Sequence, residues 1–309
     1  MSTSGIATFN LDLNNLIEEA FERCGLELRT GYDFKTARRS LNILTIEWAN
    51  RGINLWTVEQ GQIVMNTQQA IYALPIDTID ILDAVTRTNN GSQANQTDIN
   101  LTRISEPTYI TIPNKNTTGR PIQMWVNRQT GGVSNTPQTT LSGGISATDT
   151  TITLASAYEL PTQGFINIGG ETIGYQNIVG NQILNAWRGQ NGTTAAAHLT
   201  GVNVFNNQLP CINVWPTPNP PGNQYTLVYY RMRRIQDAGG NGTVEQDIPF
   251  RLLPCMVAGL AFYLSQKLPD AMQRMQFLKQ EYEEQWLIAS TEDREKEALR
   301  FVPRNLFYS

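Results

Sequence analysis

The chain has 309 residues, of which 40% are hydrophobic and 16% are charged, and its formal net charge is −4. This length fits one large or two ordinary domains, and a net negative charge excludes a surface that as a whole attracts nucleic acid. The charged fraction lies below the usual ~25%, and Asn, Gln, Thr and Gly take its place, as is common in β-rich assembly proteins.

Two amphipathic helices are predicted in residues 1–54. Apolar residues recur at helical spacing over 13–24 and again over 34–48. The residues expected to cap and stop them are Asp12 and Gly25 for the first helix, and Asp33 and Gly52 for the second. Each helix has an apolar stripe that needs a cover, so this segment is expected to be a helical hairpin of a larger bundle.

Residues 55–130 are predicted to form a central antiparallel β region, because apolar residues alternate there with a period of two. The alternating residues are Trp56, Val58, Ile71, Tyr72, Ile79, Ile81, Val85, Ile110, Met124 and Val126. The stretch 89–100 is rich in Asn and Gln and is predicted to be a loop.

Residues 131–207 differ in composition and predict a small inserted β-domain. The stretch contains no Lys and a single Arg, Arg188, and it is rich in Thr and Gly. Alternation predicts strands over 150–154, 164–168, 171–175 and 201–205. The hairpin turns are expected at Gly169-Gly170 and Asn191-Gly192.

The flanks of this stretch indicate where it is inserted. The segments 121–127 and 211–216 look like two strands of one sheet, with 225–231 as a third. If they pair as neighbours, residues 131–207 lie at a hairpin tip, where insertions are tolerated best. Residues 208–246 then supply the return strands of the central β region.

Residues 247–299 are predicted to complete the helical bundle. A helix there must start late or kink at Pro254, and 258–264 is apolar on nearly every face. Asp270 is expected to cap a long second helix, whose stripe is Ala271, Met275, Leu278, Tyr282, Trp286 and Ala289. Because the stripes at both ends lack other partners, we expect them to pack together, which makes the fold α+β.

The last ten residues, 300–309, are predicted to be an extended arm that docks on a partner. Their apolar residues form no helical stripe, and Pro303 breaks any helix. A charged spacer, 290–299, separates them from the bundle. The residues expected to dock are Arg300, Phe301, Val302, Arg304, Leu306, Phe307 and Tyr308.

Residue types for catalysis or metal binding are sparse. His198 is the sole histidine, which excludes His-paired metal sites, and we expect it in a turn or on the surface. A glycosidase needs only two carboxylates in one cleft. However, Glu18, Glu19 and Glu22 are expected to face solvent, and Glu171 has no obvious partner. We therefore predict no catalytic residue, no metal and no cofactor.

Cysteines and hydropathy complete the sequence-based picture. Cys24, Cys211 and Cys255 show no CxxC spacing, and the first and last are expected on buried helix faces. Synthesis in a reducing compartment and no signal peptide are expected. The most apolar run, 252–264, is shorter than the ~20 residues of a membrane span, so we predict no membrane insertion.

The densest basic cluster consists of Arg231, Arg233 and Arg234, with Tyr229 and Tyr230 before it and Met232 within it. Strand alternation places Arg231 and Arg233 on one face. Two interpretations stay open. The cluster contacts phosphate or an acidic partner, or it is a strand end paired with nearby carboxylates.

Three places in the sequence resemble a known family, the head-to-tail adaptor proteins of short-tailed bacteriophages, also called tail accessory or head-completion proteins. The first is Ala-Arg-Arg-Ser-Leu-Asn-Ile-Leu at 37–44 with Glu-Trp-Ala-Asn-Arg-Gly-Ile-Asn-Leu-Trp at 47–56. The second is Gly-Arg-Pro-Ile-Gln at 119–123 with Val-Trp-Pro-Thr-Pro at 214–218 and Tyr-Tyr-Arg-Met-Arg at 229–233. The third is the closing helix and arm. The insert resembles small β-domains of several phage structural proteins at 170–175 and 188–198, and the shortest adaptors lack it.

The resemblance implies a virion protein at the head–tail interface, made in the host cytoplasm. It implies a ring of about twelve copies beneath the portal that continues the DNA channel and meets the tail nozzle and fibres. DNA would pass through without specific binding. The arm 300–309 would grip the portal, and Arg231, Arg233 and Arg234 would be channel or partner contacts.

Two alternatives stay open. Some relatives are associated with peptidoglycan hydrolysis, so a cell-wall hydrolase component of the tail is one. The other is a carbohydrate- or receptor-binding module in the insert, with Trp187 or Tyr175 as a stacking platform.

Overall fold

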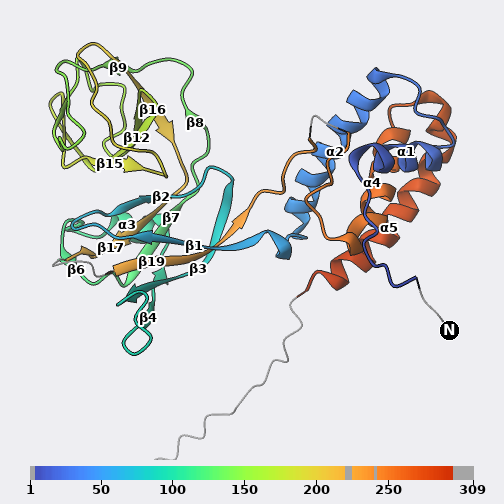
Figure 1. Cartoon of the computed structure of the whole chain (residues 1–309), viewed down its shortest axis with the longest axis horizontal. Coiled ribbons are helices and arrows are strands. Elements are labelled where there is room, and N and C mark those ends of the chain that lie inside the picture. Colours follow the sequence, from blue (N-terminus) through green and yellow to red (C-terminus); the bar gives the residue numbers. More distant parts are fainter. Residues whose placement is uncertain (1–3, 220–224, 240–241, 295–309) are drawn as a thin grey trace, which may run out of the picture. The chain divides into compact units, whose positions relative to one another are not determined.

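The computed structural model describes residues 4–219, 225–239 and 242–294 (Figure 1). The chain divides into two compact units. One contains both sequence ends, Met1–Thr57 and Ile235–Ser309, and the other is Val58–Arg234. The first is built of helices and the second mainly of antiparallel strands, so the α+β class predicted from the sequence is confirmed.

The helical unit packs N-terminal helices against C-terminal helices, visible in Figure 1 as blue helices beside orange and red ones. Its α-helices are α1 (Leu13–Cys24), α2 (Gly31–Arg51), α4 (Leu253–Ser265) and α5 (Met275–Glu292). Short 3₁₀ helices are η1 (Leu55–Thr57), η2 (Phe250–Leu252) and η3 (Pro269–Arg274). Helix α4 contacts α1, α2 and α5. Most of its side chains are buried, as expected for the apolar run 252–264.

Close packing in the core of this unit depends on Gly259 of α4. A Cβ atom there would lie 2.9 Å from carbon atoms of both Leu44 and Tyr282. Beside them, the Trp48 indole Nε1–H donates to the Tyr282 hydroxyl over 3.2 Å. The predicted packing of the N-terminal helices against the C-terminal helices is therefore confirmed.

The helix ends test the predicted caps. Asp12 caps α1 and Gly25 ends it, as predicted. Asp33 is not the N-cap of α2, since the helix begins earlier and Thr30 caps it. The Thr30 hydroxyl accepts from the Asp33 N–H, and the Asp33 carboxylate accepts from the Thr30 N–H, which is a capping box.

Of the two C-terminal α-helices, α4 starts where the sequence suggests and α5 starts later. Helix α4 begins at Leu253 with Pro254 in its first turn, so the expected late start is confirmed. Asp270 does not cap the last helix, because Pro269–Arg274 forms the 3₁₀ helix η3 and α5 begins only at Met275. Cys24 and Cys255 are buried on helix faces as predicted.

The β unit contains two four-stranded sheets that share one core. The first has the order β1 (Val58–Val64), β19 (Tyr225–Arg233), β3 (Thr78–Thr88) and β4 (Thr97–Asn100). The second has the order β2 (Ile71–Ala73), β17 (Cys211–Trp215), β7 (Gln123–Asn127) and β5 (Thr102–Arg103). Smaller elements are α3 (Glu106–Ile110), β6 (Thr118–Gly119) and β18 (Thr217–Pro218). Ile81 and Leu227 from the first sheet pack with Met124 and Ile212 from the second.

The observed elements of the two central sheets confirm one sequence-based expectation and correct three. Strands β7 and β17 are antiparallel neighbours, with Asn127 opposite Cys211. Strand β19 is not their third strand, since it pairs with β1 and β3 in the other sheet. The predicted loop 89–100 contains β4 in its last four residues. Ile110 lies in α3, because Ser105 caps a helix that carries Pro in its first turn.

Between β7 and β17 the chain forms nine short strands. They are β8 (Gly132–Val133), β9 (Thr139–Thr140), β10 (Ile152–Thr153), β11 (Gly164–Ile168), β12 (Glu171–Tyr175), β13 (Asn177–Val179), β14 (Gln182–Leu184), β15 (Trp187–Gln190) and β16 (Asn203–Gln208). Side chains such as Leu154, Ile166, Ile173 and Val204 form a core of their own. Phe165 also packs beside Ile71 of β2.

The predicted strands of this segment agree closely with those observed. The strands at 164–168 and 171–175 are β11 and β12 without change. They are joined at Gly169 and Gly170, whose φ angles of 58° and 92° suit a tight hairpin. The strand predicted at 150–154 narrows to β10, and the one predicted at 201–205 shifts to β16.

Candidate functional sites

The seven residues predicted to dock on a partner lie outside the described residues. They are Arg300, Phe301, Val302, Arg304, Leu306, Phe307 and Tyr308. The spacer 290–299 is described only as far as Arg294. The structure therefore describes the base of the arm and not the arm.

That base is fastened by Asp293, the residue after α5. Its Oδ2 accepts the backbone N–H groups of Asn54 over 2.8 Å and of Leu55 over 3.2 Å. Its Oδ1 lies 3.8 Å from Nη2 of Arg251, an ion-pair contact rather than a hydrogen bond. The Asp293 side chain is fully buried, so the end of α5 is tied to the segment that follows α2.

The helical unit leaves several large apolar side chains uncovered. Phe9 and Phe250 are 78% and 72% exposed and line a groove of about 410 Å³ together with Leu11, Leu253, Pro254 and Val257. We call this the Phe250 groove. Its charged lining residues are Glu19 and Arg23, and Arg23 pairs with Glu19 over 3.1 Å. Helix α5 adds three further residues that are each more than 60% exposed, Phe277, Leu287 and Ile288.

The arginine cluster on β19 has carboxylate partners. Arg231 donates through Nη1 to Asp77 over 2.6 Å and through Nη2 to Glu59 over 2.8 Å. Arg233 donates through Nε to Glu59 over 2.7 Å. Because both side chains reach Glu59, they lie on one strand face as predicted. A phosphate ligand would have to displace these carboxylates. The backbone N–H of Arg234 donates to the Asp77 carbonyl, and its own carbonyl accepts from Arg233 Nη1 over 3.1 Å.

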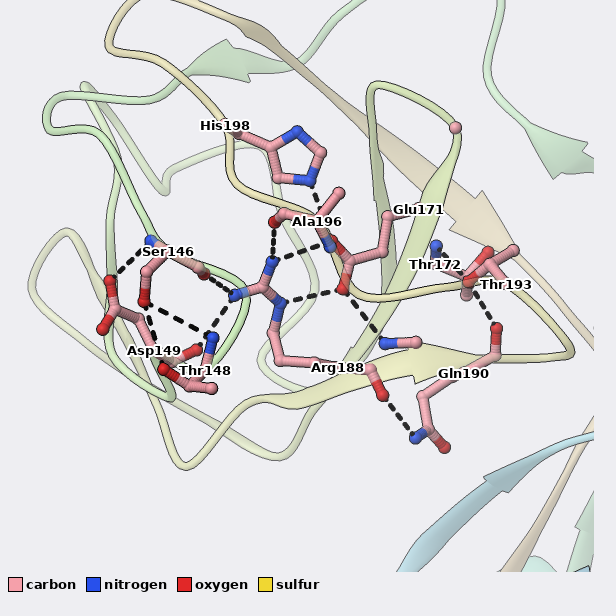
Figure 2. Close-up of polar contacts among 12 residues, drawn as sticks. Ser146, Thr148, Asp149, Glu171, Thr172, Arg188, Gln190, Thr193, Ala196 and His198 are labelled. Carbon is pink, nitrogen blue, oxygen red and sulfur yellow. Dashed lines mark hydrogen bonds and ion pairs between the residues drawn. The ribbon is translucent and has the colours of Figure 1, made fainter.

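A buried charge network lies in the segment between β7 and β17, and Figure 2 shows its contacts. Glu171 on β12 accepts from Arg188 on β15 twice, through Nε at 2.8 Å and Nη2 at 2.7 Å. The N–H groups of Gly189 and Ala196 also donate to this carboxylate, over 3.0 and 3.2 Å. His198 Nε2 lies 2.8 Å from Glu171 Oε2. We call these residues the Glu171 network.

Two expectations from the sequence are wrong here. Glu171 was expected to lack a partner, yet it is 2% exposed and accepts five hydrogen bonds. His198 was expected in a turn or on the surface, yet its side chain is 8% exposed. Both errors arise because the partners lie in other strands and loops. The sequence offered one signal, that Arg188 is the single Arg or Lys of residues 131–207.

The network stabilises the ionised form of Glu171. Burial by itself would raise the pKa of this carboxyl. The hydrogen bonds from Arg188, His198 and the N–H groups of Ala196 and Gly189 outweigh that effect, so the pKa falls to about 2. Arg188 also donates to the carbonyls of Ser146, Asp149 and Ala196. Two loops and two strands are thereby joined around one carboxylate.

A carboxylate held in this way is poorly suited to acid–base catalysis, because its proton affinity is low and its lone pairs are occupied. Within the described ranges, no group of three or more His, Cys, Asp or Glu side chains is arranged to hold a metal ion. The three cysteines are buried and free. Burial raises the pKa of Cys211 and of Cys255 to about 12, which leaves both thiols protonated at neutral pH.

The β unit also contains a polar hollow of about 450 Å³. Its lining includes Gln68, Asn116, Thr150, Gln176, Asn185 and Trp187, and none of its lining residues is charged. We call this the Trp187 hollow. Trp187 is half-buried at its edge. The prediction of Tyr175 as a stacking platform is wrong. Its ring is fully buried, and its hydroxyl donates to the Pro161 carbonyl over 2.8 Å.

The sequence matches no protein-family model and no curated protein. In the part of the chain that the structure describes, none of the helices combines the length and hydrophobicity that a membrane crossing requires.

Proposed function

We propose that this protein is a structural adaptor that forms a ring between a phage portal and the tail nozzle and fibres. The ring continues the DNA channel through which the genome is ejected. The protein acts without cofactor or membrane insertion and resides at the head–tail interface of the virion. The observation that carries the proposal is the apolar surface that the helical unit leaves in water.

The Phe250 groove and the outer face of α5 are the relevant surfaces. Contiguous exposed apolar patches above a few hundred Å² are uncommon on monomeric proteins and mark interaction sites. Aromatic side chains are also enriched where protein interfaces gain most of their energy. In a ring, each helical unit has two neighbours that cover such surfaces. Phe9 and Phe250 have much to gain from such a cover, because both are aromatic, line the same groove and are more than 70% exposed.

The proposal gives each remaining part of the chain a task. Residues 300–309 are an extended arm that grips the portal. The fastening of Asp293 to Asn54 and Leu55 supports this, because it provides a fixed base for a chain that leaves the bundle. Residues 131–207 are a small β-domain inserted at the tip of the β7–β17 hairpin, which faces a tail fibre or a neighbouring copy.

DNA passes this ring without specific binding. The net charge of −4 gives no general attraction for a polyanion. Arg231 and Arg233 are already neutralised by Glu59 and Asp77. The cell-wall hydrolase alternative also lacks support. Glu171 accepts from five donors, and none of its described contacts is a second carboxylate.

Mixing the purified full chain with purified portal, followed by electron-microscopy class averages and light scattering, tests the proposal. We expect a closed ring on the portal. Deletion of residues 300–309 is expected to abolish portal binding. Phe250→Glu is expected to block ring formation, whereas Tyr158→Glu, at an aromatic residue that is 94% exposed in the β unit, leaves it intact. A chain that stays monomeric on the portal would refute the ring. Equal portal binding without residues 300–309 would refute the assignment of the arm.

A further inference from the structure

We propose that the Trp187 hollow is a binding site for a neutral saccharide. The hollow lies within the β unit, where the segment between β7 and β17 meets the loops of the central sheets. Its volume of about 450 Å³ falls in the range of ~300–1,000 Å³ that is typical of small-molecule sites.

The chemistry of the lining selects the ligand class. Amides such as Gln68, Asn116 and Asn185 each offer both donors and an acceptor, and Thr150 adds a hydroxyl. Sugar hydroxyl groups also donate and accept at once, so the two sets match. The Trp187 indole supplies a flat apolar face for the C–H side of a pyranose ring, with a polar N–H at its edge.

The absence of charge in the lining argues against ionic ligands. A phosphate, uronate or sialate would lose water without gaining a counter-charge, which is costly in a partly enclosed site. The nearest strong base along the chain, Arg188, is already committed to Glu171 and three carbonyls. The hollow therefore fits hexose or N-acetylhexosamine units rather than acidic sugars or nucleotides.

One hydrogen bond joins two residues of the lining, and one of them keeps an acceptor without a partner among the described residues. Gln176 Nε2 donates to Asn116 Oδ1 over 3.1 Å, which links the segment between β7 and β17 to the central loops. Gln176 Oε1 is shielded from water and has no hydrogen-bond partner within the described residues. An unsatisfied buried acceptor costs about 1–3 kcal/mol.

The backbone at the hollow is left-handed at two non-glycine residues and strained at one of them, Gln68. Gln68 and Asn185 have φ angles of 60° and 54°, in the left-handed region that non-glycine residues rarely occupy. Such a residue costs about 1–2 kcal/mol, and Gln lacks the short side chain that makes Asn tolerable there. The Gln68 N–H is held by the Pro218 carbonyl over 3.0 Å. Strain kept at a residue that lines a cavity, here Gln68, is a pattern that binding sites retain.

The test uses the full-length protein with defined probes in calorimetry and saturation-transfer NMR. The neutral probes are maltohexaose and chitohexaose, which separate plain hexose chains from the N-acetylated glycans of cell walls. The anionic probe is an oligomannuronate of similar length. We expect saturable binding of at least one neutral probe and none of the anionic one. Trp187→Ala is expected to weaken binding about tenfold, the loss of about 1.4 kcal/mol of stacking.

Controls keep the outcome decisive. Tyr158→Ala removes a 94% exposed aromatic side chain from the same segment and is expected to leave binding unchanged. Gln176→Leu removes the hydrogen bond to Asn116 and the amide of a lining residue, and it replaces the Trp187 variant if that variant misfolds. The proposal is overturned if neither neutral probe saturates, if the anionic probe binds better, or if both variants bind as the parent does. Ring and portal do not enter this measurement, so its failure is separate from that of the adaptor proposal.

Discussion

Glu171→Gln is expected to destabilise the β unit by about 3 kcal/mol. The substitution keeps the size of the side chain and removes only the charge. The Arg188 guanidinium, whose side chain is 7% exposed, is then buried without its counter-charge. In addition, the new amide NH₂ group is a donor that faces other donors. In place of Oε1 it faces Arg188 and Gly189. In place of Oε2 it faces Arg188, Ala196 and His198.

Two independent considerations give this magnitude. Breaking a buried ion pair by removing one partner typically costs about 3–5 kcal/mol. The second comes from the Glu171 pKa, which lies at about 2 in the folded protein instead of 4.5. A difference of this size corresponds to about 3 kcal/mol of preference for the ionised form in the folded state.

The sign of the pH dependence follows from the depressed pKa. The stabilisation by Glu171 is present above pH 4.5 and is lost as the pH falls from there toward 2. The parent protein is therefore expected to lose stability of the β unit steeply across this window. The Glu171→Gln variant starts lower and changes less, because it has no carboxyl to protonate at that position.

Hydrogen exchange followed by mass spectrometry measures the effect in the β unit alone, apart from the helical unit. The amides of Gly189 and Ala196, which donate to Glu171, are expected to exchange about 100-fold faster in the variant. Glu159→Gln is the matched control, since it removes the same charge from an exposed position of the same segment. Equal exchange in the two variants would show that the network contributes no net stability.

The helical unit provides two further predictions. Gly259→Ala is expected to cost about 1–3 kcal/mol in urea unfolding, because the added methyl lies 2.9 Å from Leu44 and Tyr282. Gly31→Ala, at a position with open space, is expected to be neutral or stabilising, and a similar loss in both variants would disprove the packing argument. Thr30→Ala is expected to cost about 1 kcal/mol through loss of the capping box, and an unchanged urea midpoint would show that the cap is dispensable.

Local signals predicted the helical unit well. Apolar spacing and the residues at its ends defined α1 from Asp12 to Gly25. The error at Asp33 is also local, because Thr30 and Asp33 both suit an N-cap and only the geometry shows that they cap each other. The start of α5 was missed because Asp270 in a 3₁₀ turn resembles a helix cap in the sequence.

In the β unit, prediction from the sequence was limited by strand pairs and contacts between residues far apart in the chain. Alternation identified β19 as a strand but carries no information on which sheet it joins. Tyr175 was taken for an exposed platform because alternation assumes one solvent face. All five residues of β12 are buried, so the strand has no such face. The Glu171 network and the Trp187 hollow are assembled from distant loops, and only the lone Arg188 hinted at the former.

The fastening of Asp293 has a mechanical consequence. A helix pulled from its last residue normally unwinds one turn at a time, since each step breaks only a few bonds. Here tension on the chain beyond Asp293 is passed sideways to the N–H groups of Asn54 and Leu55 before the last turn of α5 is strained. Several bonds must then rupture together, which raises the force that the end of the bundle withstands. Under the adaptor function proposed above, the load that reaches the bundle from residues 300–309 acts at this point of the chain.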